Sequence, residues 1–141
     1  MSAGCTIAND LPLRACEAVL QLVPDAEVIY LFGSHADGRA HDASDLDLAV
    51  LGAMPLSPSS RFGMQRELSA RLGRDVDFVD LHAASTVLKL EVVTRGQRLY
   101  RRDADRTLEF EGRVLGEYAE LMDATRDLRA AIRERGQVYA R

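Results

Sequence analysis

Hydrophobic and polar residues along the chain form blocks that predict four helices and four strands. The expected helices cover residues 11–23, about 60–72, 85–95 and about 104–135, and the expected strands cover 27–32, 45–51, 75–81 and 97–101. Asp10 can cap the first helix, and Gly73 can end the second. Two strands in direct succession predict an α/β fold of the α+β type, with a small mixed sheet of about four strands flanked by helices.

The last predicted helix carries an apolar seam along most of its length. Its seven members recur at spacings of three or four residues: Phe110, Val114, Tyr118, Leu121, Thr125, Leu128 and Ile132. A helix over 104–135 would be about 48 Å long, more than the roughly 30 Å width of a small domain. Two alternatives stay open. Either the helix leaves the domain and offers Leu128 and Ile132 to a protein interface, or Gly112 and Gly116 bend it back onto its own sheet.

Composition and length narrow the class of protein. The chain has 141 residues, of which 47% are hydrophobic and 28% charged, so we expect one folded domain over 1–141 with a core at about 27–103. No apolar run approaches the roughly 20 residues that a membrane helix needs. The net charge of −4 argues against general nucleic-acid binding. Two cysteines, Cys5 and Cys16, are too few for a disulfide framework, so a cytoplasmic location is expected.

Three aspartates on two predicted strands are the first candidate for chemistry. Asp45 and Asp47 lie two residues apart and therefore point to the same face, and Asp77 follows the same alternation on the next strand. Carboxylates held together repel one another, and Mg²⁺, which prefers oxygen ligands, removes that repulsion. The cluster could hold two magnesium ions for phosphoryl chemistry. The alternative is that the acids are solvated strand ends, as we expect for Asp75 and for Asp80, the second choice for the third carboxylate.

A Gly-Ser pair at the end of the neighbouring strand strengthens this interpretation. Gly33 allows the backbone to approach a phosphate closely, and Ser34 offers a hydroxyl donor. Ten residues separate Ser34 from Asp45.

This segment, GSHADGRAHDASDLD from Gly33 to Asp47, resembles the motif of the minimal nucleotidyltransferases of the DNA polymerase β-like fold. The similarity extends to RDVDFVDL at 74–81, where Asp77 matches the third carboxylate, and to STVLKLEVVTRGQRLYRRD at 85–103. Length and element order look most like the nucleotidyltransferase-like antitoxins that pair with HepT toxins.

The resemblance implies a nucleotidyltransferase fold and a specific set of roles. Asp45, Asp47 and Asp77 would be the catalytic and magnesium-binding residues, and the nucleotide-binding residues would be Gly33, Ser34, His35 and Arg39. ATP would be the substrate, and AMP would pass to a tyrosine of a HepT-like toxin with release of pyrophosphate. Loops of this family often carry two arginines after Gly-Ser. Here His35 and Asp37 stand in their places, with His35 still able to donate to phosphate and Arg39 a possible substitute.

Two other functions remain open from the sequence. The chain could be an antitoxin that acts by binding alone, because the loop after Ser34 departs from the family pattern. It could also modify a small molecule, although 141 residues leave little room for a second substrate-binding domain. His82 follows a predicted strand and is expected to be an ordinary loop residue.

Overall fold

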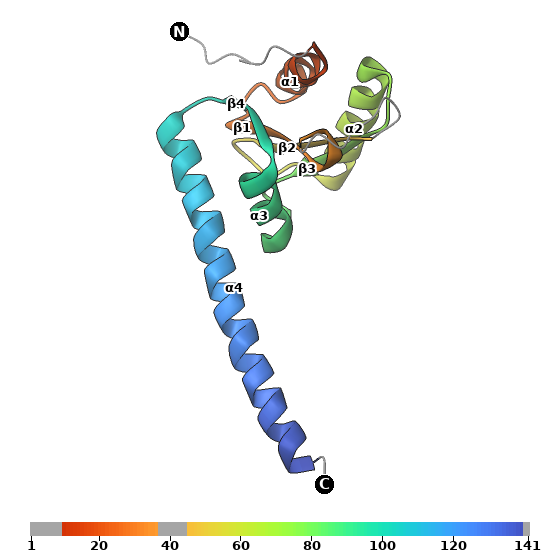
Figure 1. Ribbon diagram of the computed structural model, residues 1–141. Helices are drawn as coiled ribbons and strands as arrows, with labels where there is room; N and C mark the ends of the chain where they lie inside the picture. Colours follow the sequence, from red (N-terminus) through yellow and green to blue (C-terminus); the bar gives the residue numbers. More distant parts are fainter. Residues whose placement is uncertain (1–9, 37–44, 140–141) are drawn as a thin grey trace.

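The computed structural model describes residues 10–36 and 45–139, with backbone alone for 136–139 (Figure 1). This part of the chain forms four α-helices and four strands, in the order α1 (Asp10–Leu22), β1 (Val28–Phe32), β2 (Leu46–Leu51), α2 (Pro58–Leu72), β3 (Val76–Asp80), α3 (Thr86–Arg95), β4 (Gln97–Arg101) and α4 (Ala104–Tyr139). A short 3₁₀ turn, η1 (Gly33–His35), follows β1. Every predicted element is present, and the main difference is that α4 continues to Tyr139.

Local capping explains where α2 begins and ends. Ser57 caps the helix, since its hydroxyl accepts a hydrogen bond from the backbone N–H of Ser60 at 3.1 Å. Pro58 follows in the first turn, where a missing N–H costs nothing. Gly73 ends the helix in the left-handed conformation with φ 66°, as the sequence predicted.

The four strands form one mixed sheet in the order β3-β2-β1-β4. β1 is antiparallel to both β2 and β4, and β2 is parallel to β3. The mixed sheet predicted from the sequence is therefore confirmed, and β3 and β4 are its two edge strands. The parallel pair places Asp47 opposite Asp77 in the register.

Helices cover both faces of this sheet. On one face α1 and α2 pack on alternate strand residues such as Leu31, Leu48 and Phe78. On the other face α3 and the first turns of α4 pack on the strand residues that lie between those of the first set, among them Tyr30 and Leu51. All five residues of β1 are buried, so this central strand anchors both layers.

The outer edge of β3 is closed by side chains of α2. The hydroxyl of Ser69 accepts from the Val76 N–H at 3.1 Å, and the Gln65 side-chain oxygen accepts from the Phe78 N–H at 2.9 Å. The Arg61 guanidinium donates to the Phe78 carbonyl at 2.9 Å. These three side chains recur every four residues along one face of α2. They satisfy an edge that would otherwise be open, and they fix the strand that carries the predicted third carboxylate.

Helix α4 leaves the domain. Its 36 residues span about 54 Å, and in Figure 1 its lower half runs past the end of α3 with no other element beside it. Phe110 and Val114 of the predicted seam are buried, whereas Leu128 and Ile132 are 60% and 58% exposed. The two glycines that could have bent the helix lie inside it without interrupting it. The expectation that it might fold back onto its own sheet is therefore wrong.

Candidate active site

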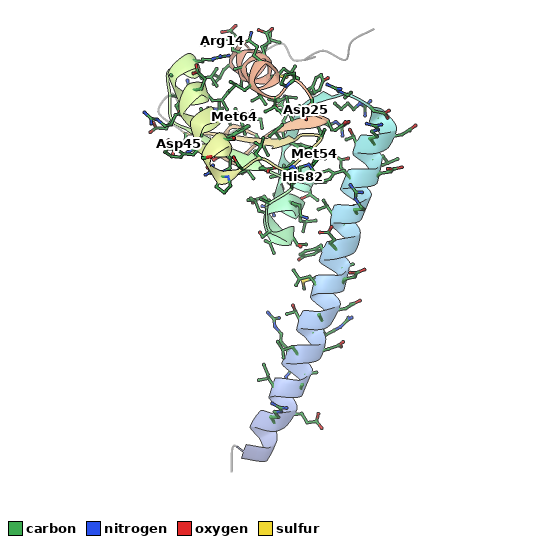
Figure 2. All side chains as sticks on the ribbon, turned by 180° about the vertical axis from the view of Figure 1, so that it is seen from behind. Arg14, Asp25, Asp45, Met54, Met64 and His82 are labelled. Atoms are coloured by element: carbon green, nitrogen blue, oxygen red, sulfur yellow. The ribbon has the colours of Figure 1, made fainter. Side chains whose placement is uncertain are left out.

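The predicted aspartates lie together at one end of the sheet. Asp47 on β2 is the register partner of Asp77 on the parallel strand β3, and Asp45 directly precedes β2. Both strand aspartates alternate with buried core residues and point to the face covered by α3. Figure 2 shows Asp45 at one end of the sheet and His82 toward the other. The alternation within each strand and the parallel register of β2 and β3 together bring the three carboxylates to one place.

Asp47 is at the electrostatic centre of this group. Partial burial raises the pKa of its carboxyl above the ordinary value, and the neighbouring charges of Asp77 and then Asp45 raise it further. The His35 imidazole on η1 acts in the opposite direction and lowers it. Without a cation, negative charge at this position is costly. Binding of a cation next to Asp47 would therefore be favourable, because it offsets this repulsion.

The turn after β1 packs directly on this carboxylate. Phe32, the last residue of β1, is the register partner of Asp47, and Gly33 then turns away with φ 72°. A Cβ atom at Gly33 would lie 2.2 Å from Oδ2 of Asp47, far inside the 3.0 Å that real contacts respect. Glycine is thus required here by the backbone conformation and by the aspartate, a reason that the sequence alone did not reveal.

The donor set suits magnesium with a nucleotide as the remaining ligand. Within 10–36 and 45–139, no three acidic, histidine or cysteine side chains lie in an arrangement that would hold a metal ion by themselves. Asp45, Asp47 and Asp77 nevertheless supply only carboxylate oxygens, and their mutual repulsion falls when a cation binds. Mg²⁺ is usually held in this way, through one or two carboxylates together with substrate phosphates. The chemistry of these oxygen donors is therefore compatible with Mg²⁺, and the magnesium site stays a prediction.

Two of the other predicted nucleotide-binding residues lie next to the carboxylates. Ser34 and His35 lie in η1, partly exposed and beside the carboxylates. Arg39 lies outside the described residues. Asp75 is exposed, as expected for a solvated acid, and its carbonyl accepts from the Leu46 N–H at 2.9 Å.

Asp80 differs from its prediction. It is only 3% exposed, and its two carboxylate oxygens accept from the backbone N–H groups of Leu56 at 2.9 Å and His82 at 3.0 Å. The expectation of a solvated acid is therefore wrong, and so is the idea that Asp80 could supply the third carboxylate. Its side chain holds the loops after β2 and β3 together. His82 is a loop residue as predicted, with its Nε2 atom 2.7 Å from the Gly52 carbonyl oxygen.

One acidic residue near the site was missed. Glu91 on α3 is exposed and close enough to Asp47 to raise its pKa. Nothing in the local sequence identifies it, because its proximity depends on how α3 crosses beneath the sheet. It adds to the negative field that a cation would neutralise.

Comparison with known proteins decides the family. The family model "Polymerase beta, Nucleotidyltransferase" matches residues 15–105, which include all three carboxylates and the glycine turn. The chain belongs to this nucleotidyltransferase family. It is also 41% identical over 99 residues to the protein adenylyltransferase MntA of Shewanella oneidensis, a match that covers 70% of each chain.

Solved structures agree with this nucleotidyltransferase assignment and confirm the predicted fold. A toxin–antitoxin crystal structure with AMP-PNP contains a chain that is 35% identical, with a TM-score of 0.72 over 82% of this chain and 96% of that one. A second structure holds the tri-AMPylated HEPN toxin of Shewanella oneidensis in complex with its MNT antitoxin. Its matching chain is 31% identical, with a TM-score of 0.72 over 86% of this chain and 95% of that one.

Proposed function

We propose that this chain is an antitoxin-type protein adenylyltransferase that moves AMP from ATP to a tyrosine hydroxyl of a HepT-like toxin and releases pyrophosphate. The observation that carries the proposal is the in-register pair Asp47 and Asp77 with the Gly33 turn packed against it. The similarity to MntA and to antitoxins crystallised with toxins supports the choice of a protein acceptor.

Each group at the site has a role in this proposal. Asp45 and Asp47 would hold Mg²⁺, with Asp77 completing a second ion site, and bound magnesium would neutralise the charge of the triphosphate. The N–H groups and hydroxyl of Gly33 and Ser34 would donate to the phosphates, helped by His35 and, from the loop outside the described residues, by Arg39.

The reaction is a substitution at the α-phosphorus. The tyrosine oxygen forms a bond to this atom, and the bond from it to the oxygen shared with the β-phosphate breaks, so that pyrophosphate leaves. Asp77 is exposed at the strand end and accepts the proton of the attacking hydroxyl. Positioning and charge neutralisation then provide most of the rate gain.

Labelled ATP tests the proposal. The chain is incubated with magnesium and a HepT-like toxin, using ATP that carries ³²P in either the α- or the γ-phosphate. Adenylyl transfer predicts label on the toxin from α-labelled ATP only. Label from γ-labelled ATP would indicate a kinase instead, and neutralisation of the toxin without any label would indicate an antitoxin that acts by binding alone.

Substitution of the carboxylates connects the activity to this site. Asp45→Asn or Asp77→Asn should reduce AMP transfer at least about 100-fold, because a charge that faces the transition state is lost. Ser34→Ala should cost less, since it deletes one neutral donor. Full transfer activity in both aspartate variants would exclude these residues from the reaction.

A further inference from the structure

The far half of α4 carries an uncovered apolar stripe. Leu121, Thr125, Leu128 and Ile132, here called the distal stripe, recur at spacings of four, three and four residues and continue the seam of Phe110 and Val114. Its three large apolar members are between 40% and 60% exposed. Among residues 10–36 and 45–139, Figures 1 and 2 show no other helix or strand beside this half of the helix. A stripe of this kind on a helix outside the domain is typical of an interaction surface.

The stripe faces the side of the sheet that carries the carboxylates. Phe110 and Val114, on the same face of α4, pack against Leu51 and Leu81 in the layer below the sheet. Asp47 and Leu51 are four residues apart on β2, so their side chains point to the same face of the sheet. This is the face that α3 and the first turns of α4 cover. A protein bound along the distal stripe therefore lies on the same side of the sheet as the candidate active site.

The base of α4 is fixed, so the stripe has a defined position relative to the site. The Tyr30 hydroxyl donates to Glu111 at 2.5 Å, and Arg98 lies 3.3 Å from the same carboxylate. Six residues further along the helix, Glu117 pairs with Lys89 of α3 at 3.0 Å. Contacts to β1, β4 and α3 thus hold the helix before it leaves the domain.

The two borders of the stripe differ in charge. In a helix each residue advances by about 100°, so the residues after the stripe members form one border and those before them form the other. The first border consists of Met122, Arg126, Arg129 and Arg133, with a shallow hollow along it. The second consists of Glu120, Ala124, Asp127 and Ala131. The partner should therefore present acidic groups to the arginine border.

A second copy of this chain does not fit the stripe. Two antiparallel copies related by a two-fold axis would bring each arginine border against its own counterpart, which repels. Two parallel copies would bring the arginine border of one helix against the acidic border of the other. Each domain, however, lies on the side of its own helix that carries the stripe. The domains would occupy the space that the partner helix needs. The occupant is therefore a different protein.

We propose that the distal stripe of α4 is the docking surface for the toxin, through a helix with an apolar face and an acidic border along Arg126, Arg129 and Arg133. The inference rests on the proposed function in one respect, that the occupant is the acceptor of AMP. Docking there holds the acceptor on the side of the carboxylates, while the nucleotide binds at the strand ends.

Calorimetric titration of the full chain with a HepT-like toxin tests the surface. Leu128→Glu with Ile132→Glu should weaken binding about 30-fold or more, as for central interface residues. Arg129→Glu with Arg133→Glu should weaken it about tenfold at low salt and less at high salt. Leu108→Glu is the matched control, because Leu108 is a 69% exposed leucine at the base of the same helix. It should stay within about twofold of the wild type.

Transfer kinetics separate docking from chemistry. In the Leu128→Glu, Ile132→Glu variant the KM for toxin should rise while kcat and the KM for ATP stay unchanged, since the site itself is intact. Circular dichroism controls the fold, and glutamate retains the helix propensity of the residues it replaces. Unchanged affinity in this variant would overturn the inference, as would a wild-type dimer in light scattering that the variant abolishes. If the wild type binds toxin but transfers no AMP, the proposed function fails while the titration still tests the surface.

Discussion

Replacing Gly33 by alanine should disable the site through Asp47. The added Cβ would sit 2.2 Å from Oδ2 of Asp47, and a separation of at least 3.0 Å requires a displacement of about 0.8 Å. A displacement of about 1 Å in a reacting group can cost about 100-fold in rate. We therefore expect Gly33→Ala to lose about two orders of magnitude in kcat for AMP transfer. The left-handed backbone at φ 72° should also lower stability by about 1–2 kcal/mol.

Gly73→Ala is the control that isolates the contact. Gly73 has a similar φ of 66°, but a Cβ there meets no atom within 4 Å. Both variants should therefore lose the stability that a left-handed backbone costs alanine, Gly33→Ala should lose somewhat more because of the contact with Asp47, and only Gly33→Ala should lose activity. If the two variants transfer AMP at the same rate, the close approach of Gly33 to Asp47 is not what the site requires.

Three further substitutions test the electrostatics and the supporting contacts. Without metal, Asp47→Asn should raise the Tm at pH 7, because a raised pKa means that ionisation of Asp47 destabilises the folded state. This advantage should shrink as the pH falls through that pKa, and added Mg²⁺ should stabilise the wild type more. Gln65→Leu should cost about 1–3 kcal/mol by leaving the Phe78 N–H without an acceptor, whereas Gln65→Glu should restore most of the Tm. Tyr30→Phe should cost about 1 kcal/mol in urea unfolding, because the hydrogen bond to Glu111 is lost.

The elements and the carboxylate pair could be predicted because they depend on local patterns. Period-two alternation places Asp45 and Asp47 on one face of their strand, and the structure adds that β3 lies beside β2 in the register that turns Asp77 to the same face. The positions of Asp80 and Glu91 could not be predicted in this way. The burial of Asp80 follows from hydrogen bonds to a loop 24 residues earlier in the chain, and the influence of Glu91 follows from the packing of α3.

The sequence also left undecided whether α4 leaves the domain or packs along its own sheet, because this too depends on tertiary packing. A continuous apolar seam is equally compatible with a helix packed along its whole length and with one that carries an uncovered surface. The decision depends on how much domain lies alongside, and here the sheet and α3 reach only as far as about Tyr118. The glycines at 112 and 116 lower helix propensity without breaking the helix, because tertiary packing holds its first turns.

The most direct measurement is the intact mass of a HepT-like toxin after incubation with ATP, magnesium and either the wild type or Asp47→Asn. Wild-type protein should add one or more AMP groups to the toxin, localised to tyrosine by peptide mass spectrometry, and Asp47→Asn should add none at the same time point. An unmodified toxin after incubation with wild-type protein that binds it would contradict the account, as would equal modification by Asp47→Asn.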